Sequence, residues 1–341
     1  MTGTMGAKER RDAWERLAGG GAQLAVGTHA LVQEAVRFRQ LGFVIIDEQH
    51  RFGVIQRATL RRKGIQPDVL VMTATPIPRT LAMTAYGDLD VSVIRELPPG
   101  RQPVATRVAG EQRRADVYRF MQRELRAGRQ GYVVYPLVEE SEKVDLKAAT
   151  EMAQRLQTEV FPDLRVGLAH GRLSPADRET VMRAFAAGDI DLLVATTVVE
   201  VGVDVSNATV MLIEHAERFG LAQLHQLRGR VGRGAQRAHC ILLHGDELSA
   251  AARARLAAVA ATTDGFEIAE RDLEIRGPGD FVGTRQSGVP ALRTGDLLRD
   301  HRIMEDARKA ARDWLAEKPP RADVDAAVAG WSERFRLAGV G

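Results

Sequence analysis

Residues 195–204, which read ATTVVEVGVD, decide the fold class that this sequence predicts. An apolar run over residues 191–195 indicates a buried strand, and a turn and a second short apolar run follow it. This order is typical of the carboxyl edge of a parallel sheet, where open α/β folds bind their ligands. Apolar runs that alternate with helical patterns along the chain indicate a doubly wound α/β fold.

Downstream, residues 223–234 read QLHQLRGRVGRG and place Arg228, Arg230 and Arg233 among three glycines. Glycine permits close approach of the backbone and arginine keeps its charge, so this pattern favours contact with a phosphate. Taken alone, the pattern is equally consistent with a solvated basic turn after a helix. The strand and turn at 195–204 favour the phosphate interpretation.

The apolar run at residues 43–46 predicts a second strand, covered on both faces. The residues that follow it are expected at the carboxyl edge of a parallel sheet. Asp47 comes directly after this run and is suited to hold Mg²⁺, directly or through water, because this hard cation prefers oxygen ligands. Glu48 is suited to position and deprotonate a water that attacks a γ-phosphate. The alternative is that the two acids only begin a helix.

The composition of the 341 residues predicts a soluble protein with two domains of ordinary size. The net charge of +3 does not by itself indicate a nucleic-acid partner. The single cysteine, Cys240, rules out an internal disulfide and is expected in a core strand. No apolar run approaches the about 18 residues of a membrane span, and residues 1–20 do not resemble a signal peptide, so we expect a cytoplasmic location.

Several stretches resemble motifs of superfamily 2 helicases. Asp47, Glu48, Gln49 and His50 resemble motif II, residues 73–75 motif III, residues 195–204 motif V and residues 223–233 motif VI. The longer stretches resemble the RecG family of branch-migration helicases: DEQHRFGV at 47–54, TATPIPRTLAM at 73–83, AERFGLAQLHQLRGRVGRG at 216–234 and RGPGDFVGTRQSG at 276–288.

The resemblance implies an ATP-dependent double-stranded DNA translocase or helicase that uses ATP and Mg²⁺, remodels stalled replication forks and migrates Holliday junctions. It implies catalytic roles for Asp47 (also the metal ligand), Glu48, Arg230 and Arg233. It implies roles in ATP binding and coupling for Gln49, His50, Thr73, Thr75, Asp204, Gln226 and Gly229. It implies DNA contacts for Thr28, His29, His170, Arg172, Thr196, Thr197, Arg285 and Gln286.

The same resemblance implies two RecA-like parallel-sheet motor domains, the first truncated at its amino end, then a helical hairpin and carboxy-terminal helices. The expected boundaries are 1–97 for the first domain, 98–105 for a linker, 106–246 for the second domain, 247–298 for the hairpin and translocation loop, and 299–341 for the last helices. The residue patterns also predict short strands at 24–26 and 91–97, and a helix capped by Ser174 at 175–187.

A P-loop of the form GxxxxGK[ST] is absent from these residues, because none of the six lysines follows a glycine. The family's amino-terminal wedge domain is also missing from the sequence. We therefore interpret the chain as the carboxy-terminal part of such a helicase and expect it to bind ATP weakly, without turnover.

The expected partners are branched double-stranded DNA, the missing wedge and P-loop region and, as a further candidate, a single-stranded DNA-binding protein. Two alternatives stay open at this point. One is a translocase of the Mfd type, which couples transcription to repair. The other is a non-catalytic fragment that grips the DNA backbone.

Overall fold

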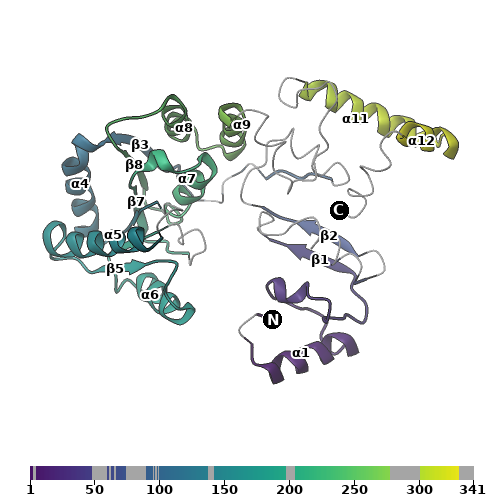
Figure 1. The fold of residues 1–341 in the computed structure, drawn as a ribbon, viewed down its shortest axis with the longest axis horizontal. Helices are drawn as coiled ribbons and strands as arrows, with labels where there is room; N and C mark the ends of the chain where they lie inside the picture. Colours follow the sequence, from purple (N-terminus) through teal and green to yellow (C-terminus); the bar gives the residue numbers. More distant parts are fainter. Residues whose placement is uncertain are drawn as a thin grey trace. The chain divides into compact units, whose positions relative to one another are not determined.

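Most strands of this protein form where the sequence is mainly apolar. The computed structural model describes residues 1–2, 5–47, 60, 63–64, 67–73, 90–94, 96, 98, 100–136, 142–196, 204–276 and 300–329. The chain divides into two compact units, one of residues 1–89 and 277–341 and the other of residues 90–276, shown in Figure 1. Each unit is described by itself.

The unit of residues 90–276 is built on a parallel sheet with the strand order β3-β8-β7-β4-β6-β5 in the part of the chain that is described. Its strands are β3 (Ala105–Gly110), β4 (Gln130–Val134), β5 (Val166–Ala169), β6 (Leu192–Ala195), β7 (Ala208–Ile213) and β8 (His239–His244). Every residue of β4, β6 and β7 is buried, as expected of parallel strands with helices on both faces. The α/β class predicted from the sequence is therefore confirmed.

Helices cover the two faces of this sheet. On one face lie α4 (Arg114–Arg126), which follows a 3-10 turn at Glu111–Arg113, and α5 (Glu142–Arg155), which continues as a π-helical segment at Leu156–Val160. On the other lie α6 (Pro175–Ala187), α7 (Leu221–Arg228), α8 (Ala250–Ala261) and α9 (Gly265–Arg276). Figure 1 shows α4 and α7 on opposite sides of β7 and β8. Successive side chains of a strand point to opposite faces of the sheet. Leu212 therefore belongs to the hydrophobic core with α4, and Ile213 to the core with α7.

Local signals in the sequence set both ends of α6. The Ser174 hydroxyl accepts a hydrogen bond of 3.1 Å from the backbone N–H of Asp177, which confirms the predicted cap of α6. The helix ends at Gly188, whose φ of 83° is the left-handed conformation that glycine adopts without steric cost.

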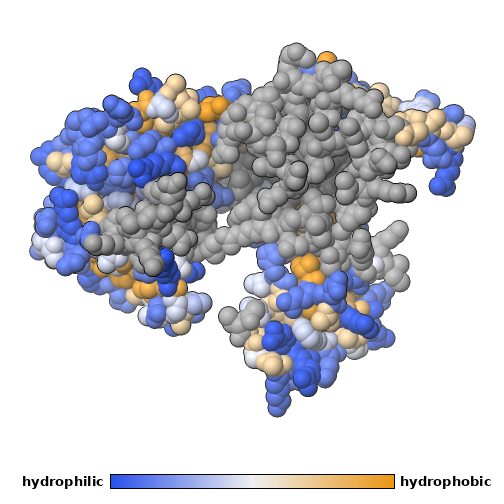
Figure 2. Space-filling view, in the orientation of Figure 1, coloured by the Kyte–Doolittle hydropathy of each residue, from blue (hydrophilic) through white to orange (hydrophobic). Residues whose placement is uncertain are grey.

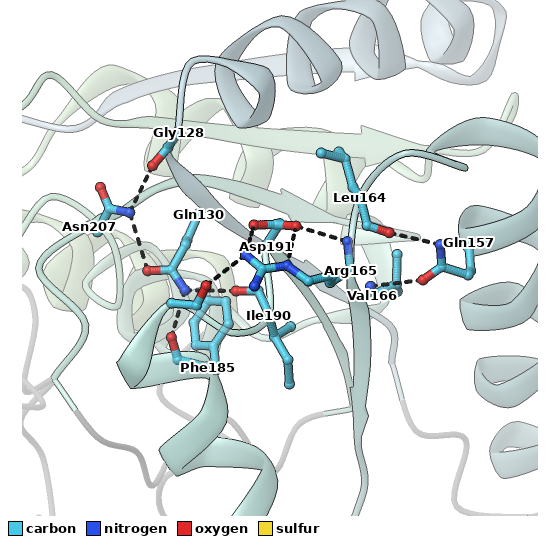
Figure 3. Close-up of polar contacts among 11 residues, drawn as sticks. Gly128, Gln130, Gln157, Leu164, Arg165, Val166, Phe185, Ile190, Asp191 and Asn207 are labelled. Carbon is cyan, nitrogen blue, oxygen red and sulfur yellow. Dashed lines mark hydrogen bonds and ion pairs between the residues drawn. The ribbon is translucent and has the colours of Figure 1, made fainter.

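A polar network closes the amino ends of the central strands (Figure 3). The buried Gln130 side chain donates hydrogen bonds to the carbonyls of Phe185 (2.6 Å) and Ile190 (2.7 Å), and Asn207 donates to Gln130 Oε1. The Phe185 carbonyl at the end of α6 also accepts from the backbone N–H of Gly188, and the bond to the Ile190 carbonyl satisfies the backbone just before β6. The network therefore fixes the end of the sheet that lies opposite the carboxyl edge.

The other unit contains a smaller parallel sheet of β1 (Phe43–Ile46) and β2 (Asp68–Val71), together with α1 (Ala7–Gly19), a 3-10 turn at His29–Leu31, α11 (His301–Ala316) and α12 (Arg321–Val328). The expectation that β1 is covered on both faces is wrong. Val44 and Ile46 are buried with Leu60, whereas Phe43 and Ile45 are more than half exposed. Only one face of this strand packs against a hydrophobic cluster, so burial alternates along it.

Three further differences from the sequence-based expectation concern strands. No strand forms at residues 24–26 or over the described residues 91–94, where Leu24 is 82% and Ile94 is 90% exposed. Apolar residues alone do not make a strand unless the backbone finds a partner strand. Conversely, the structure contains β3, which the sequence pattern did not predict because Arg107 interrupts its short apolar run.

Candidate functional site

The candidate site of the larger unit is the carboxyl edge of its sheet. Backbone hydrogen bonds join the residues that follow neighbouring strands: Glu214 N–H donates to Val134 O (2.9 Å), Tyr135 N–H to Ala195 O (2.9 Å) and Thr196 N–H to Ala169 O (3.3 Å). The residues after β7, β4, β6 and β5 therefore form one row along this edge. This is the edge at which parallel α/β sheets bind their ligands.

His170 and Thr196, two predicted DNA contacts, lie at the ends of the adjacent strands β5 and β6. His170 Nδ1 and Thr196 Oγ1 are both buried and have no hydrogen-bond partner in the described part of the chain. Burial, followed by the charges of Arg172 and Arg178, lowers the pKa of His170 below its ordinary value, so the ring is neutral at pH 7. Two polar groups without partners at a strand edge are suited to bind a ligand.

Arg230 and Arg233 follow α7, whose buried residues Leu221, Leu224 and Leu227 fix its position on the sheet. Arg233 Nη1 lies 3.6 Å from Asp204 Oδ1. Burial raises the pKa of the Tyr132 hydroxyl to about 12, while the nearby charges of Arg230 and Arg233 lower it and that of Asp204 raises it. The charges of Asp204, Arg230 and Arg233 therefore all lie near the same buried tyrosine.

The backbone near these arginines is held by further contacts. The carbonyl of Gly229 accepts hydrogen bonds from Arg101 Nη2 (3.4 Å) and from Arg233 Nε (3.3 Å). Gln226 is half-buried on α7, one turn before Arg230. The structure thus brings together Asp204 and the predicted site residues within 226–233. It adds Arg101 and Tyr132, for which the sequence carried no signal.

Arg228 differs from its two neighbours. Its side chain is only 3% exposed, and Nη1 donates hydrogen bonds of 2.7 Å to the carbonyls of Val259 and Thr262 at the end of α8. Nη2 contacts His225 Nδ1 at 2.9 Å, and burial lowers the pKa of His225 to about 4, so this nitrogen accepts as a neutral ring. The interpretation that Arg228 faces a phosphate is therefore wrong. The side chain joins α7 to the α8–α9 hairpin.

Glu214 is a buried acid that the sequence analysis missed. Its side chain is fully buried, and its carboxylate oxygens accept from Arg114 Nη1 (2.5 Å) and Nη2 (2.9 Å). Arg114 also donates to Glu111, and these hydrogen bonds outweigh burial and raise the pKa of Arg114 above its ordinary value. The next residue, His215, adopts a left-handed φ of 48° and begins the 3-10 turn Ala216–Arg218 that leads to α7. The pair therefore anchors the start of the segment that carries the arginines.

In the smaller unit, Asp47 and Thr73 come after the adjacent strands β1 and β2, and Met72 N–H donates to Ile46 O at 2.7 Å. Asp47 is exposed at its strand end, and one carboxylate with water is a donor set that fits Mg²⁺. Thr28 N–H donates to Met1 O, and His29 begins a 3-10 turn. The remaining predicted site residues lie outside the described residues: Glu48, Gln49, His50, Thr75, Thr197, Arg285 and Gln286.

Within the described residues, no three His, Cys, Asp or Glu side chains form a group that could hold a metal ion. None of the helices described there is both long enough and apolar enough to span a membrane.

Family models match most of the chain in three segments. Residues 1–84 match the DEAD/DEAH box helicase family, residues 112–235 the helicase conserved C-terminal domain, and residues 262–334 the C-terminal part of domain 3 of ATP-dependent DNA helicase RecG.

Curated relatives and a solved structure resemble the chain over most of its length. The ATP-dependent DNA helicase RecG of Acidithiobacillus ferridurans is 54% identical over 97% of this chain and 48% of its own length. That of Synechocystis sp. is 52% identical over 94% of this chain and 38% of its own length. A structure of RecG bound to a three-way DNA junction has a TM-score of 0.66 and 46% identity, covering 89% of this chain and 39% of that one. The chain thus spans less than half the length of these relatives.

Proposed function

Because this chain is homologous to the carboxy-terminal part of the ATP-dependent DNA helicases named RecG, we propose that it provides part of an ATP-driven translocase that acts on branched double-stranded DNA. The relative of known structure is bound to a three-way DNA junction, which supports this class of substrate. The observation that carries the proposal is the ion pair of Arg233 with Asp204 near Arg230 and Tyr132, together with strand ends whose polar groups have no partner in the described chain.

In this proposal Arg230 and Arg233 stabilise the charge that develops on the γ-phosphate of ATP. Arginines in this role contribute about 10³ to 10⁵ to the rate of phosphoryl transfer. Asp47 would hold Mg²⁺, which would neutralise phosphate charge, and Glu48 would position and deprotonate the attacking water. Gln49, His50, Thr73, Thr75, Gln226 and Gly229 couple the state of the nucleotide to the rest of the chain.

The DNA-contact half of the proposal rests on His170, Arg172 and Thr196. A neutral imidazole, a guanidinium and a hydroxyl at one strand edge match the phosphate and sugar contacts that position a protein on DNA without reading its sequence. Thr28, His29, Thr197, Arg285 and Gln286 extend this set, and the α8–α9 hairpin transmits movement from the arginine segment through Arg228. We assign residues 1–97 and 106–246 to the two motor domains and 247–298 to the hairpin and its loop.

A binding titration with a three-way DNA junction tests this half of the proposal. Thr196→Val keeps the shape of the side chain and removes a hydroxyl that has no partner within the described chain, so we expect unchanged thermal stability and weaker DNA binding. Arg172→Ala should lower the slope of log K against log salt concentration by about 1, whatever the DNA sequence.

Arg183→Ala is the matched control for charge, because Arg183 is 72% exposed on α6 and pairs only with Glu179 there. This variant should leave the salt slope unchanged. DNA binding that is insensitive to salt, or that responds equally to Arg172→Ala and Arg183→Ala, would contradict the assignment of this edge to DNA.

A further inference from the structure

A hollow of about 440 Å³ lies between β3 and α4, apart from the carboxyl edge described above. β3 is the outermost strand of its sheet in the described chain, and Ala105, Arg107 and Ala109 alternate along it. Their partners on β8 are His239, Ile241 and Leu243, so the side chains of this set share one face. Two alanines leave a space beside α4 that larger side chains would fill.

The floor of this hollow is apolar. Ile241 is 6% and Val117 is 7% exposed, and both belong to the core between α4 and the sheet. The half-buried ring of Phe120 meets the His239 ring edge-on, with the centroids 5.0 Å apart. Apolar surface of this shape is suited to take one bulky aliphatic or aromatic side chain.

The rim is strongly cationic. Four arginines line the hollow, and Asp116 is the single acid among the lining residues, where it pairs with Arg113 and Arg119. In the described chain, the guanidinium groups of Arg107 and Arg123 take part in no hydrogen bond or ion pair, and that of Arg123 lies 5.4 Å from the centroid of the Phe120 ring. The two unpaired guanidinium groups are suited to bind carboxylates. The apolar floor below them is suited to bind an apolar side chain of the same ligand.

This surface does not continue the DNA-contact edge. Among the described strands, β3 and β5 are the two outermost in the sheet, so five strand spacings, or about 24 Å, separate them. His170 and Thr196 follow β5 and β6, whereas the hollow runs along β3. A duplex presents phosphates but no side group that would fill an apolar floor, so the chemistry favours a polypeptide. Figure 2 shows that the visible surface of this unit is largely hydrophilic with scattered hydrophobic patches.

We propose that this hollow binds an acidic segment of a partner protein, which inserts one bulky apolar side chain against Phe120, Val117 and Ile241. Its carboxylates pair with Arg107 and Arg123. The site is separate from the strand ends at His170 and Thr196, and its occupation leaves them open.

The test is fluorescence anisotropy of the 341-residue protein with a labelled peptide that carries one leucine flanked by glutamates. We expect saturable binding that weakens about tenfold when glycine replaces the leucine, since the apolar contact is lost. Arg107→Glu should weaken binding about 100-fold, because it sets an acid against the carboxylates. Ala105→Leu should abolish binding of the peptide, because the larger side chain fills the hollow. This variant leaves the charge of the protein unchanged.

Arg183→Glu is the control, since it makes the same change of charge on α6 at an exposed position. Circular dichroism shows whether each variant is folded, and binding of the three-way junction should be unchanged in Arg107→Glu and Ala105→Leu. The proposal is overturned if the peptide does not bind, or if Arg107→Glu and Ala105→Leu bind it as tightly as the unaltered protein. It is equally overturned if duplex DNA displaces the peptide and Arg107→Glu weakens DNA binding, because the hollow would then belong to nucleic acid.

Discussion

Replacing Glu214 by alanine should lower the free energy of unfolding of the unit of residues 90–276 by about 3 kcal/mol or more. The Glu214 side chain is fully buried, and its removal leaves the Arg114 guanidinium, which is only 25% exposed, without the carboxylate that accepts two of its hydrogen bonds. Most of the loss comes from this uncompensated charge and not from the value of the ion pair itself. Glu111 retains its contact with Arg114 and moderates the effect.

Chemical denaturation followed by circular dichroism measures this loss. Glu214→Gln preserves the shape and removes the charge, so its effect should be intermediate. The control is Glu179→Ala, because the pair of Glu179 with Arg183 is more than 70% exposed on both sides and should contribute at most about 1 kcal/mol. Equal losses for Glu214→Ala and Glu179→Ala would show that the buried pair does not anchor the arginine segment.

The second large effect is expected for Arg228→Ala, at about 2–4 kcal/mol of unfolding free energy. The change leaves the carbonyls of Val259 and Thr262 without their donor and opens a space between α7 and α8. Arg228→Lys should recover only part of the loss, because an ammonium group does not reproduce the fork that reaches two carbonyls and His225. Arg253→Ala, on the exposed side of α8, should have little effect.

The reactivity of the single cysteine, Cys240, measures whether the contact between Arg228 and the end of α8 is intact. Cys240 is buried in the core shared with α7 and α8, and burial raises the pKa of its thiol to about 12, so a thiol reagent should react slowly with the folded protein. Arg228→Ala should accelerate this reaction, whereas Arg253→Ala should not. A thiol that stays equally protected in Arg228→Ala would mean that α8 does not depend on Arg228 for its position.

The sequence predicted the parts of the fold that depend on local patterns. Residues 192–195 are apolar, residues 240–243 are apolar between two histidines, and both runs form buried strands, while Ser174 caps the helix that it was expected to begin. β3 could not be predicted in this way, because an edge strand with an exposed Arg107 lacks a continuous apolar run. Residues 208–213, by contrast, are mainly apolar and form the buried strand β7.

The functional edge was predictable only in part. Arg228, Arg230 and Arg233 are chemically alike in the sequence, and only the packing of α8 on α7 shows that Arg228 binds helix-end carbonyls. Glu214 and Arg114 are separated by 100 residues, so no local pattern could connect them. Long-range contacts of this kind depend on the strand order, which a single sequence does not specify.

We propose that this chain carries the acidic residues Asp47 and Glu48 and the arginines Arg230 and Arg233 of an ATP-driven motor, but that it does not turn over ATP by itself, because its 341 residues contain no P-loop sequence. The most direct test is the release of phosphate from ATP with Mg²⁺ and a three-way DNA junction, for the unaltered protein and for Glu48→Gln. We predict the same background rate for both proteins, because no lysine and glycine-rich loop cradles the phosphates. A DNA-stimulated rate of phosphate release that Glu48→Gln abolishes would contradict the prediction that this chain alone does not turn over ATP.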